Sequence, residues 1–352
     1  MLTSTENTAV PDGFFAGKRI ALVGGAGFIG HHLALALERA GAEVHVVDGL
    51  QVNSLGFYSS NYRDNANAER YLTFLNERLA MLRSAQIALH VVDARDYHIV
   101  TRILNTIEPD AVVHLAAVAH ANRSNKDPYS TFDHSLRTLE NVLDAVRSLG
   151  THVVYFSSSL VYGQFGNQPA FEDRLCEPLG IYGALKFAAE KLVISYNQVF
   201  DLPYTIVRPS ALYGERCVSR RVGQAFIENA LTGQELTVNG DGSDALDFTY
   251  IDDLVQGVQR ILAVEAARGE TFNITYGDAQ SINDMALLVQ ERFPSIRIRH
   301  DERDVLMPER GTLSIDKARD ILGYRPEHDL RSGFTRYMDW YQHLAENHPN
   351  LF

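Results

Sequence analysis

Cysteine is scarce in this sequence, with Cys176 and Cys217 the only two among 352 residues. Two cysteines exclude a disulfide framework and a cysteine-based metal cage, and they favour a reducing compartment. Long apolar runs are also missing, because none reaches the roughly 18 to 20 residues that a membrane-spanning helix needs. The amino-terminal stretch "MLTSTENTAVPDGFF" lacks the basic and apolar regions of a secretory signal. We therefore expect a cytoplasmic protein with no membrane partner and no metal site.

Positive charge is in deficit as well. The chain has 32 Lys and Arg against 44 Asp and Glu, which gives a formal net charge of -12. A protein that binds nucleic acid normally presents a basic face to the phosphates, so this balance argues against a nucleic-acid partner. It still allows a small molecule that carries phosphate, since helix amino termini and a few arginines can bind one locally.

The rest of the composition is that of a globular protein, with 45% hydrophobic and 22% charged residues. Short runs rich in Val and Ile alternate with amphipathic stretches: "RIALVGG", "AEVHVVD", "ALHVVDA", "AVVHLAA", "HVVYFSS" and "YTIVRPS". Such runs predict buried parallel strands, and helices are expected at 28–40, 134–149 and 182–199. The pattern predicts an α/β fold: a Rossmann-type doubly wound parallel sheet with a smaller, mostly C-terminal lobe for the substrate.

Three glycines follow the first expected strand in "RIALVGGAGFIGHH": Gly24, Gly27 and Gly30. Glycines let the backbone turn tightly and approach a pyrophosphate, whose charge then lies on the free N–H groups at the start of a helix. Asp48 ends the next strand about 20 residues later, where its carboxylate can accept hydrogen bonds from the adenosine ribose. That carboxylate repels a 2'-phosphate, and "DGLQVN" offers no adjacent Arg. The pattern therefore predicts NAD rather than NADP.

Two further strand ends fit the same cofactor. Asp93 in "VVDARD" is expected to accept a hydrogen bond from the adenine amino group, and "HLAA" places small residues where the backbone must lie close to the cofactor. Each motif alone is more often ordinary strand termination, but together they indicate one crevice along the carboxyl ends of the strands. The other residues expected to contact NAD are Phe28, Ile29, Ala94, Leu115, Ala116, Ala117 and Pro209.

The domain boundaries follow from these patterns. We expect an NAD-binding Rossmann domain over residues 17–205, to which a segment near 247–264 returns as a strand and a helix. The regular alternation then loosens, so residues 206–246 and 265–345 are expected to form the substrate-binding lobe. The stretch 48–84 is long and polar, with helical spacing in its second half, and predicts an enlarged crossover between strands.

"IYGALK" places Tyr182 and Lys186 four residues apart, on one face of an expected helix. A nearby ammonium favours the phenolate and lowers the pKa of the tyrosine, and a positively charged nicotinamide acts in the same direction. Upstream, "FSSSLVYG" places three serines at the end of a buried strand. Serine is a common turn residue that satisfies local backbone groups, so the serines alone leave a structural and a catalytic interpretation open.

The order of these motifs resembles that of a known family. The glycine pattern, Asp48, Asp93, "HLAA", "SSSLVYG", "YGALK", "RPSALYG" and "GDGSDALDFTYIDD" occur in the order found in extended short-chain dehydrogenase/reductases of the NAD-dependent epimerase/dehydratase family. The likeness runs from about Lys18 to about Gly333. It implies an enzyme that holds NAD in its Rossmann domain and a nucleotide sugar against the C-terminal lobe. Homodimerisation through a pair of helices is implied by the resemblance alone.

The resemblance also implies a role for each catalytic residue. Tyr182 is expected to remove a proton from a sugar hydroxyl as hydride passes to the nicotinamide. Lys186 is expected to keep Tyr182 ionised and to hold the nicotinamide ribose, while Ser158 hydrogen-bonds the reacting oxygen. Ser159 is expected to face the sugar or to support the turn.

The residues after Ser158 narrow the reaction. Dehydratases of the family resemble one another in an Asp-Glu pair directly after the catalytic Ser or Thr, because elimination of water needs an acid and a base. This chain has Ser159 and Leu160 there, so dehydration is disfavoured. C3/C5 epimerases are disfavoured too, since they use a Cys at the position of Leu160. The expected activity is transient oxidation of a hydroxyl-bearing carbon, most simply C4, and re-reduction on the other face.

Two alternatives stay open. The same three residues also suit an NAD(H)-dependent ketoreductase or dehydrogenase that acts on a sugar nucleotide or another small hydroxylated metabolite. A third hypothesis is an NAD-sensing protein that has lost catalysis, and the intact Ser158, Tyr182 and Lys186 argue against it.

Three positions depart from the family pattern. Leu246 replaces an Arg that pairs with a diphosphate in many relatives, and Ala211 and His134 replace expected asparagines. Loss of a bidentate phosphate contact is not a conservative change, so either another arginine binds the diphosphate or the substrate differs from the usual UDP-sugars. The residues expected to contact the substrate are Ser159, His120, Ser210, Arg220, Arg221 and Arg310.

Overall fold

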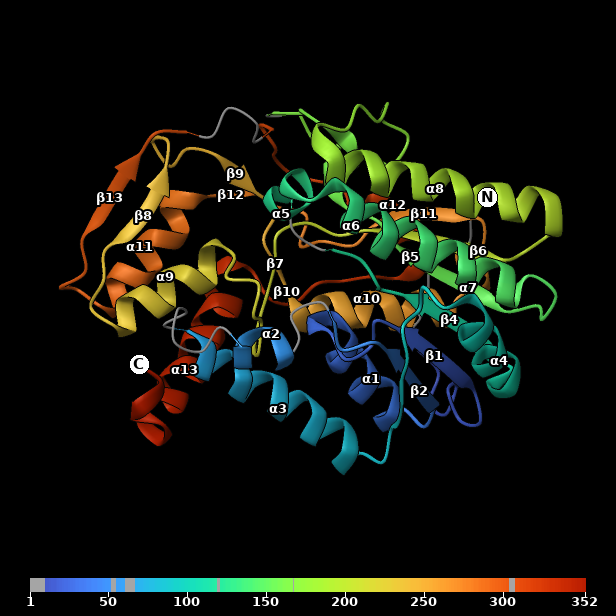
Figure 1. Ribbon diagram of the computed structural model, residues 1–352. Helices are drawn as coiled ribbons and strands as arrows, with labels where there is room; N and C mark the ends of the chain where they lie inside the picture. Colours follow the sequence, from blue (N-terminus) through green and yellow to red (C-terminus); the bar gives the residue numbers. More distant parts are fainter. Residues whose placement is uncertain (1–9, 52–54, 61–66, 119–120, 167, 304–307) are drawn as a thin grey trace.

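The computed structural model describes residues 10–51, 55–60, 67–118, 121–166, 168–303 and 308–352. In this part of the chain, seven parallel strands form one sheet in the order β11-β6-β5-β4-β1-β2-β3 (Figure 1). They are β1 (Arg19–Val23), β2 (Glu43–Asp48), β3 (Ala88–Val91), β4 (Ala111–His114), β5 (His152–Phe156), β6 (Tyr204–Arg208) and β11 (Glu270–Asn273). All six apolar runs predicted to be strands lie in this sheet, and the doubly wound α/β fold is confirmed.

Helices cover both faces of the sheet, which explains why its central strands carry apolar side chains on both faces. Leu22 and Val113 pack into the core on one face, and Ala21 and Val112 pack into the core on the other. The first face is covered by α1 (Phe28–Arg39), α3 (Ala68–Ser84) and α10 (Ile251–Ala263), and the second by α4 (Tyr97–Ile107), α7 (Thr138–Val146) and α8 (Gly180–Phe200) (Figure 1). None of the helices described is both long and apolar enough to cross a membrane.

The lobe is built from short paired strands instead of one large sheet. The pairs are β7 (Leu212–Tyr213) with β10 (Thr249–Tyr250), β9 (Ala245–Leu246) with β12 (Gln280–Ser281), and β8 (Leu236–Asn239) with β13 (Ile298–Asp301). The remaining longer helices are α9 (Val222–Leu231), α11 (Ile282–Arg292), α12 (Asp316–Leu322) and α13 (Leu330–Asn347). Leu22 of the sheet and Phe334 of α13 belong to one continuous core, so the two parts fold against each other.

Several short elements connect these layers. They are α2 (Leu55–Ser60), α5 (Ala121–Lys126), α6 (Pro128–Phe132), a π-helical turn (Asp133–Arg137) and 3-10 turns at Ser159–Tyr162, Glu265–Ala267 and Pro349–Leu351. The predicted crossover over 48–84 therefore contains α2 and α3.

The segment 247–264 returns to the sheet only in part. Its helix α10 packs against α1, but its strand β10 pairs with β7 outside the main sheet. The seventh strand is β11, which pairs with β6 although it lies in the range 265–345 expected for the lobe. Phe272 is the one large apolar residue of β11, so this strand gave no apolar run by which to recognise it.

Candidate active site

The turn after β1 brings the backbone close to the end of β4. Gly24 has a φ of 82°, and a Cβ on it would lie 2.7 Å from the backbone nitrogen of Ala116. A Cβ on Gly30 would similarly lie 2.5 Å from the Cα of Gly25. Only glycine fits these two positions without a shift of backbone, so the spacing of the glycines is explained by the close approach of neighbouring backbone segments.

The start of α1 lies directly beyond this turn. Gly27 precedes the helix in an extended conformation, and no described side chain caps it. The N–H groups of the first turn, which includes Phe28 and Ile29, have no partners within the helix, and the helix dipole favours an anion there. An uncapped, glycine-lined helix start fits the pyrophosphate of NAD.

Asp48 lies where β2 ends beside the same turn. Its carboxylate accepts hydrogen bonds from the backbone N–H of Ala26 at 3.0 Å and of Leu50 at 2.7 Å. Burial raises the pKa of Asp48, and these two hydrogen bonds oppose that shift. The backbone thus places a carboxylate at the glycine turn, where the predicted contact with the ribose requires one.

Asp93 has partners that the sequence did not indicate. Arg95 donates to both of its carboxylate oxygens, at 2.6 to 3.1 Å, and Gln51 donates at 2.9 Å. The hydrogen bonds from Arg95 hold the pKa of Asp93 well below its usual range. A contact between Asp93 and adenine must share this carboxylate with Arg95, and it stays a prediction. The other predicted cofactor residues follow the carboxyl ends of strands, with Ala94 after β3, Leu115 and Ala117 after β4, and Pro209 after β6.

Lys186 and Tyr182 lie one turn apart on α8, as predicted. The Nζ of Lys186 donates to the backbone oxygen of Phe156 at 2.6 Å and lies 6.0 Å from the centre of the Tyr182 ring. Burial lowers the pKa of Lys186 to about 7, and the charge of Glu190 opposes that shift. Burial raises the pKa of Tyr182, whereas the charge of Arg221 and a hydrogen bond with Ser158 lower it. The three predicted catalytic residues therefore form one cluster.

Each of the three serines at the end of β5 has a different role. Ser157 donates to Oε1 of Glu190 at 2.5 Å, behind the catalytic cluster. Ser158 hydrogen-bonds Tyr182, and its Oγ also accepts from the backbone N–H of Leu160 at 3.2 Å. The backbone N–H of Ser159 donates to the oxygen of Pro209 at 2.9 Å, and its side chain is buried. Ser158 thus lies beside Tyr182, while Ser157 and Ser159 are bound to Glu190 and to the backbone of Pro209.

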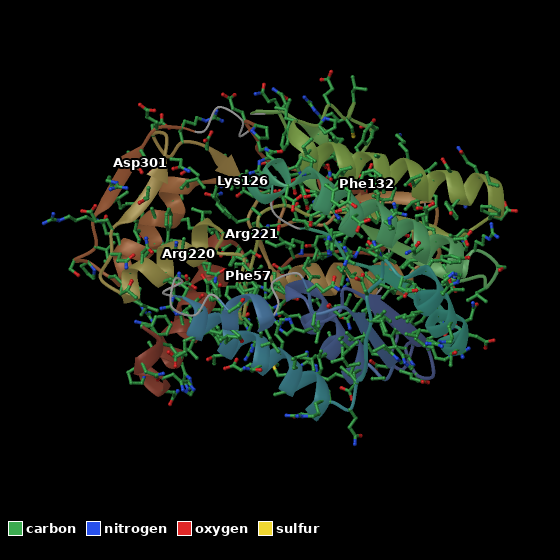
Figure 2. The ribbon with its side chains drawn as sticks, viewed as in Figure 1. Phe57, Lys126, Phe132, Arg220, Arg221 and Asp301 are labelled. Carbon is green, nitrogen blue, oxygen red and sulfur yellow. The ribbon has the colours of Figure 1, made fainter. Side chains whose placement is uncertain are left out.

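The two adjacent arginines before α9 differ in their surroundings. Arg220 donates to Glu228 at 3.4 Å and to Asn229 at 2.8 Å, which commits it to α9. Figure 2 shows Arg220 over the lobe and Arg221 nearer the middle of the molecule. The charge of Arg221 acts on Tyr182 and on Arg310.

Arg310 is the second cation of this region. Burial, followed by the charge of Arg221, lowers the pKa of Arg310 to about 10. Its Nε is buried and has no hydrogen-bond partner in the described part of the chain. Arg221 is therefore within electrostatic reach of both Arg310 and Tyr182. Of the remaining predicted substrate residues, Ser210 is buried after β6, and His120 lies outside the described residues.

Two buried residues next to the cluster were missed by the sequence analysis. Glu190 follows Lys186 by one helical turn, a spacing that could have identified it. His114 ends β4, and neither of its ring nitrogens has a hydrogen-bond partner among the described residues. Burial, followed by the charge of Lys186, lowers the pKa of His114 to about 3. In the described part of the chain, no group of three or more His, Cys, Asp or Glu side chains could hold a metal ion.

Comparison with known proteins matches residues 20–275 to the model of the NAD dependent epimerase/dehydratase family. Among curated relatives, UDP-glucuronate 4-epimerase 4 of Arabidopsis thaliana is 26% identical over 96% of this chain and 76% of that protein. A protein of Bacillus subtilis named uncharacterized UDP-glucose epimerase YtcB is 28% identical over 93% of this chain and 99% of that protein. The structure of UDP-glucuronic acid 4-epimerase from Bacillus cereus, in complex with UDP-glucuronic acid and NAD, has a TM-score of 0.81 at 25% identity, covering 93% of this chain and 99% of that one.

The matched residues include the glycine turn, Asp48 and the cluster of Ser158, Tyr182 and Lys186. The resemblance stated from the order of the motifs is thus confirmed, and with it the extended short-chain fold and NAD as the cofactor. The chain belongs to the NAD dependent epimerase/dehydratase family.

Proposed function

We propose that the protein inverts a hydroxyl-bearing carbon of a nucleotide-activated sugar, most simply C4, by NAD-dependent oxidation and re-reduction. The observation that carries this proposal is the cluster of Ser158, Tyr182 and Lys186, with the charge of Arg221 acting on its tyrosine. A proton acceptor beside cations suits a hydroxylated substrate that carries phosphate. Relatives named as epimerases of UDP-glucuronate and UDP-glucose agree with the predicted activity on a nucleotide sugar.

The residues of the glycine turn and its neighbours would hold NAD. The glycine turn at Gly24 and the uncapped start of α1 after Gly27 would hold the pyrophosphate, Asp48 would meet the adenosine ribose, and Lys186 would meet the nicotinamide ribose. When bound, NAD would supply the acceptor and donor of hydride for the sugar carbon. The protein supplies the position and the electrostatics.

Three side chains move or hold the proton of the reacting hydroxyl. Tyr182 accepts this proton at its phenolic oxygen and returns it when the carbon is reduced on the other face. Lys186 stabilises the phenolate by its charge, and Ser158 donates a hydrogen bond to the reacting oxygen.

Arg310 and Arg221 are proposed to bind the diphosphate in place of the arginine that Leu246 replaces. Arg310 has an enclosed Nε without a partner among the described residues, and Arg221 acts on it electrostatically. Two neighbouring guanidinium groups are stabilised by an anion between them. Arg220 is excluded from this role because its side chain is bound to Glu228 and Asn229.

The test is to incubate the purified protein, with no nicotinamide added, with a panel of UDP-, GDP-, CDP- and dTDP-sugars, and to follow the products by NMR. We expect a new stereoisomer that approaches equilibrium, because an epimerase regenerates its own NAD. Turnover only after addition of NAD or NADH would instead establish the ketoreductase or dehydrogenase alternative. Absence of turnover under both conditions would contradict both enzymatic proposals.

A homodimer and a role in carbohydrate biosynthesis are further proposals. Exposed apolar side chains on α6 and α8 support the dimer: Phe132, Leu192 and Val199 are 48%, 37% and 70% exposed. Light scattering of the purified protein should give twice the mass of the chain, and the mass of a single chain would contradict the dimer. The cytoplasmic location also stays a prediction, which fluorescence microscopy of a tagged protein would test.

A further inference from the structure

We propose that Glu190 is a positioning residue of the active site, whose buried carboxylate fixes the end of β5 and maintains the charge of Lys186 behind Tyr182. The inference rests on the proposed function, since it assigns a residue that acts on the proposed base through another side chain. It concerns a residue that touches neither the substrate nor the reacting atoms.

Glu190 is the centre of a buried polar network. Its side chain is 2% exposed, and Arg208 at the end of β6 donates to both carboxylate oxygens, at 2.9 and 2.7 Å. Ser157 of the strand end donates to the same carboxylate at 2.5 Å. The guanidinium of Arg208 in turn lies 4.8 Å from the centre of the Tyr162 ring. One carboxylate therefore joins α8, the end of β5 and the end of β6.

This network is not explained by stability alone. Removal of two charges from water is costly, and a buried ion pair can often be replaced by apolar residues of similar volume without loss of stability. The location of the network also points to a role in the active site. Ser157, which donates to Glu190, is adjacent to Ser158, and Lys186 donates to Phe156 on the other side of Ser157. The strand end that carries Ser158 is thus bound to α8 at two consecutive residues.

Glu190 also determines the charge near Tyr182. Burial favours the neutral form of Lys186, and among the described residues the carboxylate of Glu190 is the charge that opposes this effect. The other titratable groups that face Lys186 are Tyr182 on α8, Tyr155 on β5 and His114 on β4. Burial keeps His114 and Tyr155 neutral near pH 7, because it lowers the pKa of His114 to about 3 and raises that of Tyr155 well above its ordinary value. A cationic Lys186 at neutral pH therefore depends on Glu190.

Two pH-dependent readouts distinguish this role from a purely structural one. We would measure the pH profile of kcat/KM, with the best substrate of the sugar panel, for the full-length wild type and for Glu190→Gln. Loss of the carboxylate favours neutral Lys186. The alkaline limb of the profile, where activity falls as Lys186 loses its proton, therefore moves to lower pH. The acid limb, where activity rises as Tyr182 loses its proton, moves to higher pH, because the phenolate loses a neighbouring cation. We expect the two limbs to move in opposite directions, each by about one pH unit.

Two further variants separate charge from structure. Ser157→Ala removes one donor but keeps the carboxylate, so its limbs should stay at the wild-type pH while the rate falls by less than about threefold. The double variant Glu190→Gln/Arg208→Met removes both charges of the buried pair, and its fold is expected to tolerate the change better than that of Glu190→Gln. Its limbs should shift in the same direction by a smaller amount. An equal loss of rate at every pH in both proteins that carry Glu190→Gln would overturn the proposal.

A measurement without turnover separates this inference from the proposed function. The ionisation of Tyr182 can be followed by tyrosinate absorbance, as the difference between each protein and its Tyr182→Phe counterpart. The midpoint of this titration should move to higher pH when Glu190 is replaced by Gln. If the wild type converts no sugar nucleotide but this titration shifts, the proposed function fails and the electrostatic role of Glu190 stands. If conversion occurs and the titration is unchanged, only the role of Glu190 fails.

Discussion

The sheet part and the lobe differ in the groups that they contribute to the proposed site. The part based on the seven-stranded sheet uses backbone: a turn at Gly24, the uncapped start of α1 and an Asp48 held by backbone N–H groups. The lobe and the segments that join it to the sheet are proposed to use long side chains, Arg221 and Arg310. A site built from backbone can be recognised in the sequence, because only glycine tolerates some backbone conformations and close approaches. A guanidinium group can reach the same point from several positions.

This difference predicts that replacements have separable effects. Changes in the first part should alter binding of the cofactor, and changes among the arginines should alter binding of the substrate. The catalytic cluster lies on α8 and on the turn after β5, within reach of the charge of Arg221, and a change at Tyr182 should alter turnover alone.

Tyr182→Phe is expected to have the largest effect. Loss of the proton acceptor should lower kcat by at least about 100-fold, while the affinity for NAD stays within about twofold because the ring remains. End-point assays on the sugar panel measure kcat, and fluorescence titration with NAD measures the affinity for the cofactor. Tyr196→Phe, at a half-buried position on the same helix, is the matched control and should keep the wild-type kcat. More than one tenth of the wild-type kcat in Tyr182→Phe would place the base elsewhere.

The contrast between backbone and side chains also explains what sequence could predict. The six apolar strand runs predicted six of the seven strands of the sheet, and Gly24, Asp48 and the spacing of Tyr182 and Lys186 predicted most of the proposed site. Sequence could not separate Arg220 from Arg221, because neighbouring residues at a helix start point in different directions and only packing decides which one joins Glu228. β11 was missed because a four-residue strand with one large apolar side chain has no detectable period.

The next largest effect is expected for the arginines. Arg310→Met should lower kcat/KM for the nucleotide sugar by about 10- to 100-fold, the range for loss of a hydrogen bond to a charged group. The change should appear mainly in KM, because the diphosphate is bound equally before and during the reaction. Steady-state kinetics on the best substrate of the panel provide the measurement.

Arg220→Met is the matched control for that experiment. Its side chain is 44% exposed and bound to Glu228 and Asn229, so kcat/KM should change by less than about threefold. Arg221→Met should resemble Arg310→Met, and none of the three variants should change the affinity for NAD. An Arg220→Met variant with the larger KM would reverse the assignment of the two neighbours.

A smaller effect is expected at Asp48. Asp48→Asn keeps an oxygen that can accept from Ala26 but removes the negative charge, so the affinity for NAD should fall by about tenfold. The affinity for NADP should rise, since the charge that repels a 2'-phosphate is gone. Isothermal titration with both cofactors measures the change. Equal losses for the two cofactors would mean that Asp48 only holds the turn.

The smallest effect is an opposite response to acid of two buried histidines in the sheet part and a buried carboxyl group in the lobe. Burial lowers the pKa of His114 to about 3 and that of His32 to about 4, both below the ordinary value of 6.5. The unfolded chain therefore binds these protons more readily, and the stability that the neutral side chains contribute is lost as the pH falls from 6.5 toward 4. In the lobe, Asp247 is fully buried, and burial raises its pKa from 3.8 to about 6. Its folded form holds a proton that the unfolded chain releases, so it contributes stability at low pH that is lost as the pH rises from 3.8 to 6.

Thermal unfolding between pH 7.5 and 5 tests this opposition with two variants. The wild type should lose several degrees of Tm as the pH falls, because the combined pKa shifts of His114 and His32 outweigh that of Asp247. His114→Leu removes one of the titrating groups, whose ring nitrogens have no partners among the described residues, and its Tm should fall less. Asp247→Asn removes the opposing group, and its Tm should fall more. The same dependence on pH in all three proteins would show that other groups control the acid response, and that the two parts do not differ in this respect.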